Sequence, residues 1–269
     1  MILTLYANAL ASKLRAPKGS AGALSLTDLP AFCRNELGLN GIALTTKLLV
    51  GVDRAMLQAI VQAGDRAGCP CLALVESDPQ PLGDIDLAGA AADRVQRVVQ
   101  AAHWLGCSAV GIPVESSDNE DALLTAAEAL RPVLRKVEKM EMNLCITSGK
   151  GLTSTPERVA ELLKKVGGFR IGTFPDYESA SQQPDPTVYL RKLVPYASTV
   201  LAATLKFEGT GKAIKHVPYD LAEYTKILAT VGYDGPLAID YRGAGDPVAG
   251  LIKARDLIRT ITGSPDDDD

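Results

Sequence analysis

A regular alternation of short apolar segments with longer amphipathic ones constrains the fold of this chain more than any other feature. In its clearest example an apolar segment ends at Thr147, a helical segment begins at Thr155-Pro156-Glu157, and a second apolar segment follows Gly167-Gly168 and ends at Phe174. Proline in the first turn and glycine after the last turn are typical of helix boundaries, and short apolar runs favour buried strands. The stretch predicts two parallel strands joined by a helix.

The same unit recurs along the whole sequence. Apolar segments predict strands at 1–6, 41–49, 71–75, 108–114, 143–147, 169–174, 199–207 and 236–241. Amphipathic segments predict helices at 26–37, 53–68, 84–105, 119–140 with a kink or break at Pro132, 155–166, from 185 onward, 220–231 and 246–262, and residues 7–24 suggest a long loop. Eight such units in 269 residues predict an α/β protein with a single (β/α)8 TIM barrel over 1–262 and an acidic tail at 263–269. A doubly wound open sheet competes, but it usually has fewer units.

Charge and composition exclude several classes of protein. The net charge of −4 gives no electrostatic support to nucleic-acid binding. The sequence holds no apolar run long enough for a membrane span, and its start is a poor signal peptide. Five cysteines are an odd number for a disulfide framework, so we expect reduced thiols and a cytoplasmic protein. The sequence is also compatible with an oligomer.

Polar residues at the carboxyl ends of the predicted strands are the candidates for a site, because barrel enzymes use that end. Asp176 and Asp240 stand out, since each follows an apolar strand. Two carboxylates there can share a divalent cation or divide acid and base roles, or they can merely cap helices or pair with Lys206 or Arg242. The candidates for substrate binding are Glu76, Glu115, Thr147, Lys206, Lys212 and Arg242.

Histidine and cysteine add little to this set. The chain has two histidines, so a site with several histidine ligands is excluded. His103 belongs to a predicted helix, whereas His216 follows the seventh strand and is a candidate base or ligand, or a plain loop residue. The cysteines precede strands or lie within elements, which favours buried packing over a zinc site. Glycine-rich loops after the seventh and eighth strands suggest a phosphate site, although Asp246 and Pro247 also suit a helix start.

Several motifs together resemble a known family, the xylose isomerase-like TIM barrels, also called sugar phosphate isomerases/epimerases. Residues 143–166 resemble its fifth strand and following helix, and Gly172-Thr173-Phe174-Pro175-Asp176-Tyr177 resembles its sixth strand. Gly232-Tyr233-Asp234-Gly235 leading to Ile239-Asp240-Tyr241-Arg242-Gly243 resembles its eighth. The resemblance implies a barrel that acts on a small sugar or sugar phosphate.

The same resemblance implies a divalent metal, Mn²⁺ or Mg²⁺, held by Glu, Asp, His and Glu from strands five to eight. Here Asp176 and Asp240 match two of those ligands, whereas Thr147-Ser148-Gly149 stands for the strand-five Glu-Asn-His and Leu201 for the histidine. We therefore expect an incomplete metal site. Two hypotheses follow: an isomerase or epimerase-like enzyme on a small carbohydrate, or a non-catalytic relative that binds a carbohydrate-like ligand or a protein partner.

Overall fold

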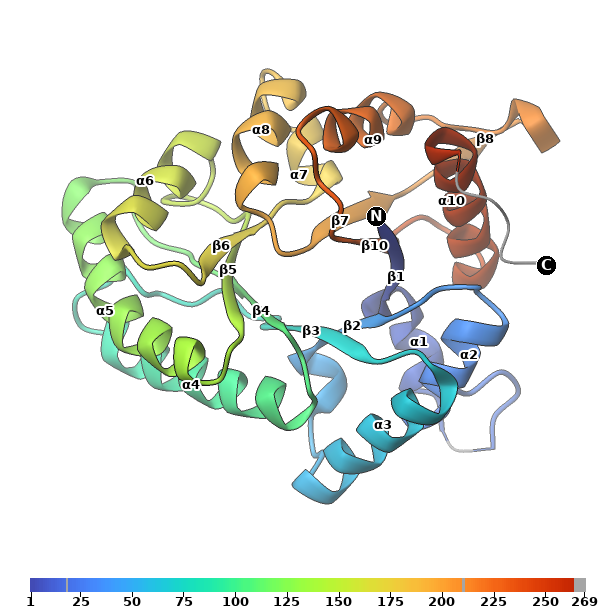
Figure 1. Ribbon diagram of the computed structural model, residues 1–269, viewed down its shortest axis with the longest axis horizontal. Helices are drawn as coiled ribbons and strands as arrows, with labels where there is room; N and C mark the ends of the chain where they lie inside the picture. The colour runs from blue at the N-terminus through green and yellow to red at the C-terminus, as the bar shows by residue number, and fades with distance from the viewer. Residues whose placement is uncertain (18, 210, 264–269) are drawn as a thin grey trace.

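The strands of the computed structural model, which describes residues 1–17, 19–209 and 211–263, form a closed ring surrounded by helices (Figure 1). Over these residues the ring is an eight-stranded parallel sheet. Its strands are β1 (Ile2–Tyr6), β2 (Ile42–Thr45), β3 (Cys71–Val75), β4 (Ala109–Pro113), β5 (Asn143–Thr147), β6 (Ile171–Phe174), β7 (Val200–Thr204) and β10 (Pro236–Tyr241). A short antiparallel pair of two-residue strands, β8 (Phe207–Glu208) and β9 (Lys215–His216), lies outside the ring. The predicted single (β/α)8 barrel is confirmed.

Helices cover the outer side of the strands (Figure 1). The main ones are α2 (Leu29–Asn35), α3 (Arg54–Ala67), α4 (Ala88–Trp104), α5 (Glu120–Lys139), α6 (Pro156–Val166), α8 (Pro186–Leu193), α9 (Leu221–Thr230) and α10 (Pro247–Thr262). Two short α-helices, α1 (Ala11–Leu14) and α7 (Tyr177–Ser181), follow β1 and β6, and four short 3-10 helices are η1 (Ala7–Leu10), η2 (Thr46–Leu49), η3 (Val194–Tyr196) and η4 (Gly211–Ala213). The predicted tail falls on residues 264–269, outside the described part of the chain.

The ring closes between β6 and β7, where the contact is looser than in the other seven pairs. The continuous ladders run in the order β6-β5-β4-β3-β2-β1-β10-β7. Across the remaining seam, Asp176 forms an isolated parallel bridge with Leu201, whose N–H donates to the Pro175 carbonyl at 2.8 Å. Asp176 is therefore fixed at the point where the barrel closes.

The core has two parts, because each strand has an outer and an inner face. The outer part fills the space between strands and helices with Leu, Ile and Val side chains. The inner part, inside the ring, contains mainly small residues, with Ala43, Ala73, Ala109 and Ala238 among them. Phe174 and Leu201 are its largest members, and Tyr6 packs against it. Small inner residues leave room above them at the end of the barrel.

Several predicted boundaries differ from the structure. Of the kink or break predicted at Pro132, the break does not occur, because helix α5 continues through this residue, which lies on the exposed side of the helix. The predicted loop at 7–24 contains η1 and α1, and strand two ends at Thr45, directly before η2 begins at Thr46. Strand seven ends at Thr204, because the Leu205 N–H donates to the His216 ring rather than to a neighbouring strand.

Helix caps match the sequence signals well. Asp185 and Asp246 accept hydrogen bonds from backbone N–H groups in the first turns of α8 and α10, each with proline at the next position. Asp53 and Thr155 do the same for α3 and α6.

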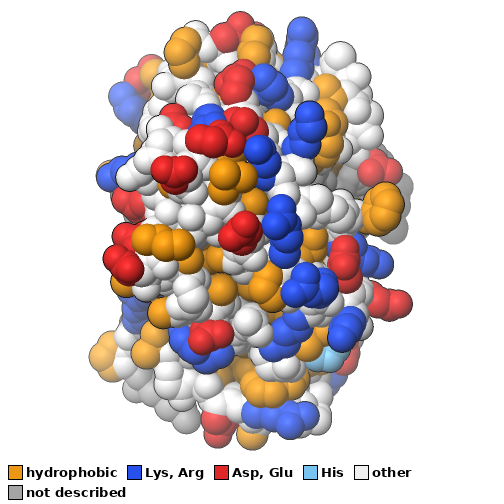
Figure 2. All heavy atoms as spheres, turned by 90° about the vertical axis from the view of Figure 1, so that its left-hand side faces the viewer, with side chains coloured by type: hydrophobic (Ala, Val, Ile, Leu, Met, Phe, Trp, Pro, Cys, Tyr) orange, Lys and Arg blue, Asp and Glu red, His pale blue; other side chains and the backbone are white. Residues whose placement is uncertain are grey.

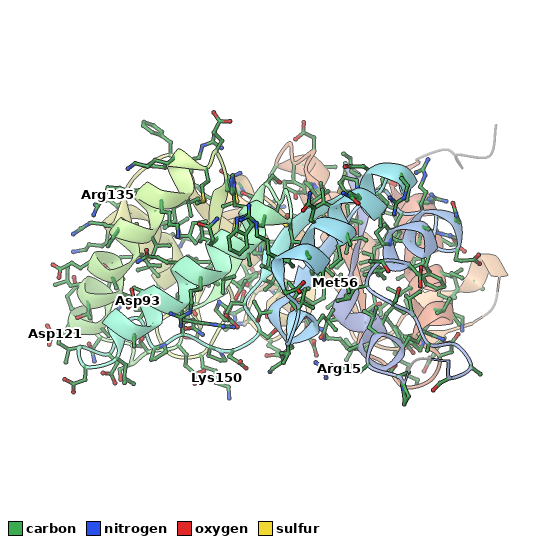
Figure 3. All side chains as sticks on the ribbon, turned by 90° about the horizontal axis from the view of Figure 1, so that it is seen from below. Arg15, Met56, Asp93, Asp121, Arg135 and Lys150 are labelled. Atoms are coloured by element: carbon green, nitrogen blue, oxygen red, sulfur yellow. The ribbon has the colours of Figure 1, made fainter. Side chains whose placement is uncertain are left out.

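In the side view, Arg15 and Lys150, which follow β1 and β5, lie at one edge, and Arg135 near the end of α5 lies at the other (Figure 3). The first edge is the carboxyl end of the strands.

On the face that carries α5 and α6, acidic and basic side chains alternate with apolar ones (Figure 2). Part of this pattern is an ion-pair network in which Arg158 bonds Asp118 and Glu161, while Lys165 pairs with Glu120. Among the helices described, none is both long and apolar enough to cross a lipid bilayer.

Candidate active site at the mouth of the barrel

A cavity of about 280 Å³ opens at the carboxyl ends of the strands. Apolar side chains of Val75, Pro113, Phe174 and Leu201 form part of its lining. The remaining lining is mostly polar and comes from Tyr6, Asn8, Thr45, Lys47, Glu76, Ser77, Thr147, Ser148, Asp176, Ser179 and Arg242. A concave site with apolar surface and convergent hydrogen-bonding groups is the usual form of a small-molecule site.

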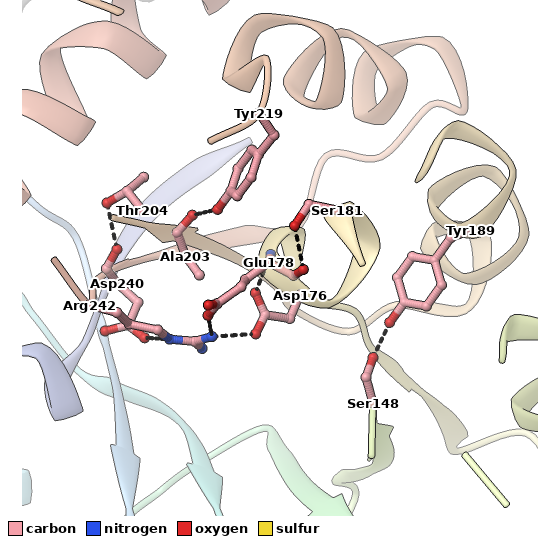
Figure 4. Close-up of polar contacts among 10 residues, drawn as sticks. All are labelled: Ser148, Asp176, Glu178, Ser181, Tyr189, Ala203, Thr204, Tyr219, Asp240 and Arg242. Carbon is pink, nitrogen blue, oxygen red and sulfur yellow. Dashed lines mark hydrogen bonds and ion pairs between the residues drawn. The ribbon is translucent and has the colours of Figure 1, made fainter. Parts of the chain in front are cut away.

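One guanidinium holds the charged groups of this mouth together (Figure 4). Nε of Arg242 donates to Oδ2 of Asp240 at 2.7 Å, and Nη1 lies 2.9 Å from Oδ2 of Asp176. The same Nη1 also donates to the carboxylate of Glu178. Three carboxylates therefore converge on a single positive charge.

Local structure explains this convergence. Asp240 and Arg242 are two residues apart at the end of β10, so their side chains leave the same face of the strand. The Arg242 N–H donates to the Thr204 carbonyl at 2.8 Å, which extends the pairing with β7 by one residue. Asp176 caps α7 by accepting from the Glu178 N–H at 3.0 Å, and this short helix directs Glu178 toward Arg242.

Burial changes the acidity of the two aspartates. Asp240 is only 1% exposed, and burial raises its pKa to about 6 although Arg242 lowers it. Burial likewise raises the pKa of Asp176, with Arg242 and the Glu178 N–H acting in the opposite direction. Oδ1 of Asp240 is buried and has no hydrogen-bond partner in the described part of the protein. The mouth thus contains a buried carboxyl group whose pKa is raised to about 6 and whose Oδ1 has no hydrogen-bond partner among the described residues.

The opposite side of the mouth carries a second buried carboxylate. Glu76 accepts from Thr46 Oγ1 at 2.8 Å and from Arg94 Nε at 2.7 Å. Its neighbour at the rim, Lys47, pairs with Asp78 at 3.0 Å. Glu76, which directly follows β3, is therefore held by side chains from η2 and α4, two elements that are separate in sequence.

The structure brings five of the predicted site residues to one place: Glu76, Thr147, Asp176, Asp240 and Arg242. The other predicted residues lie elsewhere. Glu115 is exposed outside the mouth, and Lys206 pairs with Glu208 beside a separate hollow of about 690 Å³. The side chain of Lys212 lies outside the described part of the chain.

His216 is not at the mouth. It is 6% exposed and lines a different cavity, of about 350 Å³, beside α9. Its Nε2 accepts from the Leu205 N–H at 3.0 Å, so Nδ1 carries the proton and donates to the Tyr219 carbonyl, also at 3.0 Å. Burial lowers its pKa, which keeps the ring neutral. Both ring nitrogens are occupied by the backbone.

Sequence reasoning missed some residues of the mouth. Tyr6 ends β1 and lines the cavity, and burial raises the pKa of its hydroxyl group. Glu178, two residues after Asp176, completes the group around Arg242. Ser148 shares a hydrogen bond with the Tyr189 hydroxyl (Figure 4). The position of Tyr6 at a strand end was a usable signal, whereas the Ser148–Tyr189 contact is tertiary.

The fold and the mouth define a class: a (β/α)8 barrel with a polar, carboxylate-rich site at the carboxyl ends of its strands. Comparison with family descriptions gives the particular family. Residues 34–261 match the family described as xylose isomerase-like TIM barrel, and the chain belongs to it. A search among curated proteins finds no match.

Solved structures of sugar epimerases share this fold. An L-ribulose 3-epimerase superposes with a TM-score of 0.78 at 16% identity, covering 98% of this chain and 95% of that one. A D-psicose 3-epimerase in the presence of D-fructose gives 0.73 at 12%, covering 98% and 97%. The 3-keto-D-glucoside 4-epimerase from E. coli gives 0.73 at 12%, covering 97% and 99%. At these identities the likeness concerns the fold.

The family resemblance implies a divalent cation, and such an ion needs several oxygen or nitrogen ligands arranged around one position. Within residues 1–17, 19–209 and 211–263, no three His, Cys, Asp or Glu side chains are arranged to hold a metal. Both oxygens of Asp176 are already bonded, one to the Glu178 N–H and one to Arg242. Leu201, at the position that matches the family histidine, offers the cavity a hydrocarbon side chain. In this arrangement the donor set does not fit a divalent ion.

Proposed function

We propose that this protein binds a small carbohydrate at the mouth of the barrel and acts on it as an isomerase or epimerase. The observation that carries the proposal is the mouth itself, in which apolar surface from Phe174 and Leu201 lies beside a ring of hydrogen-bonding groups. A sugar ring or chain has C–H faces and hydroxyl edges that suit such a lining. The shared fold with sugar epimerases supports the same class of ligand.

The chemistry requires a group that removes a proton next to a carbonyl and returns one. A carboxyl group whose pKa lies near the working pH does this best. Asp176 lines the cavity and its pKa is raised, so we assign it as the acid–base group. Arg242 would stabilise the negative charge that develops on the carbonyl oxygen, and Asp240 would position that guanidinium.

The remaining candidates have supporting roles in this proposal. Thr147 and Glu76 line the cavity and would accept or donate hydrogen bonds to ligand hydroxyls. Three carboxylates around one guanidinium favour a neutral sugar over a phosphorylated one near Arg242, because a phosphate adds like charge. We therefore expect a neutral ketose to bind more tightly than its phosphate.

Proton exchange tests this proposal. The protein is incubated with D-psicose or D-fructose in deuterated water, and loss of the C–H signal next to the carbonyl is followed by proton NMR. We expect exchange with wild type and loss of exchange with Asp176→Asn. Asp78→Asn is the matched control, because Asp78 is an exposed aspartate after β3 that does not line the cavity. Equal exchange in all three proteins would contradict the assignment.

A second candidate is a non-catalytic protein that binds a carbohydrate-like ligand. It is favoured by the engagement of both aspartates with Arg242, since a carboxylate held in an ion pair is a weaker base. This candidate predicts that a sugar raises the melting temperature without any proton exchange. A panel of neutral ketoses that neither stabilise the protein nor exchange protons would contradict both candidates.

A further inference from the structure

The carboxylates of the mouth are organised around a cation that belongs to the chain. Asp176 and Asp240 match two metal ligands in the family resemblance, yet each directs an oxygen to the guanidinium of Arg242, at 2.9 and 2.7 Å. Glu178 contributes a third carboxylate to the same nitrogen that Asp176 contacts. Hydrogen bonds of this length leave no space for an ion between donor and acceptor.

A divalent ion would also have to share these oxygens with Arg242. Arginine stays protonated under all ordinary conditions, so its charge cannot be removed to admit a metal. The ligand positions on neighbouring strands offer no replacement, because Thr147 supplies a neutral hydroxyl and Leu201 no donor atom. A metal and the present guanidinium are therefore alternatives at this site.

One further atom indicates that the carboxylate site is only partly used. Asp240 is 1% exposed, and its Oδ1 has no partner among the described residues, although Oδ2 bonds Arg242. Buried polar atoms are nearly always satisfied, so this oxygen retains an unused capacity to accept a hydrogen bond or to bind a cation. It belongs to a cluster that carries three negative charges against one positive.

We propose that the guanidinium of Arg242 is the resident cation of the mouth, and that its removal opens a latent carboxylate site for a divalent metal. In the wild type, Arg242 forms ion pairs with Asp176 and Asp240 in the place of a metal ion, so the site is organised without a metal. Without the guanidinium, Asp176, Glu178 and Asp240 face a common space. The inference concerns the cation alone, and it holds whether a bound sugar is turned over or only held.

Titration with Mn²⁺ tests the proposal. The full chain is titrated with Mn²⁺ while free ion is measured by electron paramagnetic resonance, and the melting temperature is recorded in parallel. Wild type is expected to show no saturable site. Arg242→Gln is expected to bind one ion per chain at least about tenfold tighter than the weakest affinity that the wild-type titration can detect, because it frees three carboxylate ligands and removes one positive charge.

Two matched variants locate the effect. Arg242→Lys keeps the charge and is expected to bind Mn²⁺ no better than wild type. Asp176→Asn added to Arg242→Gln removes one freed ligand, so the gain in binding should disappear. Circular dichroism checks that each variant is folded.

Two results would overturn the proposal. One is saturable Mn²⁺ binding by wild type that Asp176→Asn abolishes, since the metal would then coexist with Arg242. The other is a folded Arg242→Gln protein that binds Mn²⁺ no better than wild type. If Arg242→Gln does not fold, the wild-type and Arg242→Lys titrations decide: no saturable site in either supports the proposal, and a site in either contradicts it. Proton exchange on sugars is a separate measurement, so failure of the proposed function is distinguishable.

Discussion

Replacing Arg242 with glutamine should destabilise the protein in a way that depends on pH. The substitution keeps much of the side-chain length and removes the only cation that contacts Asp240 within the described residues. Asp240 is almost fully buried, and its Oδ1 already lacks a partner. Loss of Arg242 leaves both oxygens without a charged partner.

The expected magnitude follows from the burial of the pair. Removing one partner of a buried ion pair costs about 3–5 kcal/mol. Arg242 is one-third exposed, and Asp240 can take up a proton instead of remaining charged, so we expect a loss of about 2–3 kcal/mol near pH 7.5. For a chain of this size that corresponds to a fall in melting temperature of roughly 5–10 °C.

The pH dependence gives the sharper test. In wild type the pKa of Asp240 is already raised by burial to about 6, and loss of Arg242 raises it further. A carboxyl group with a raised pKa in the folded state binds more protons than in the unfolded state, so its unfavourable effect grows as pH rises. The difference in free energy of unfolding between wild type and Arg242→Gln should therefore be larger at pH 8 than at pH 5.

Urea unfolding followed by circular dichroism at both pH values measures this difference. Lys206→Gln is the control, because Lys206 forms an exposed ion pair that contributes little. A loss that is the same at pH 5 and pH 8, or no greater than that of the control, would refute the argument that Arg242 compensates a buried carboxylate.

Three other predictions come from other parts of the barrel. Because burial lowers the pKa of His216, the folded state binds fewer protons than the unfolded state below about pH 6.5, so stability should fall with acidification there, and His216→Gln should reduce that slope. Urea unfolding between pH 5 and 7 measures the slope, with exposed His103→Gln as the control; equal slopes in wild type and His216→Gln would contradict the assignment. Gly172→Ala should destabilise by about 1–3 kcal/mol in thermal unfolding, because the new Cβ would lie 2.3 Å from the Tyr196 carbonyl oxygen, whereas Gly89→Ala, with open space at the same position, should not. All five cysteines are buried free thiols, so a thiol reagent should label the native protein far more slowly than the protein in urea; rapid native labelling would show that the barrel opens.

Much of the fold could be predicted because its signals are local. Apolar runs of four to six residues mark the strands, and residues such as Asp185 and Asp246, each followed by proline, mark the helix starts. The misjudged boundaries have tertiary causes. Strand seven, for example, stops at Thr204 because the distant His216 accepts the N–H of the next residue.

The candidate site was predictable only in part. Strand ends meet at one edge of a parallel barrel, so the position of Asp176, Asp240 and Thr147 near one another follows from the order of elements. Position at a strand end did not bring Glu115 or Lys206 to the cavity, because the direction of a side chain in a loop depends on its neighbours in space. The loop position of His216 likewise gave no sign that the backbone binds both its nitrogens.

The sequence by itself determined the alternation of strands and helices and the family, and it predicted an incomplete metal site. All of these depend on residue types and spacing along the chain. Only the tertiary structure decided that Arg242 joins Asp176, Glu178 and Asp240, because these three carboxylates come from two strand ends and a short helix that meet only when the barrel closes. Local periodicity determines from which face of a strand a side chain projects, but long-range packing determines which charged side chains it contacts.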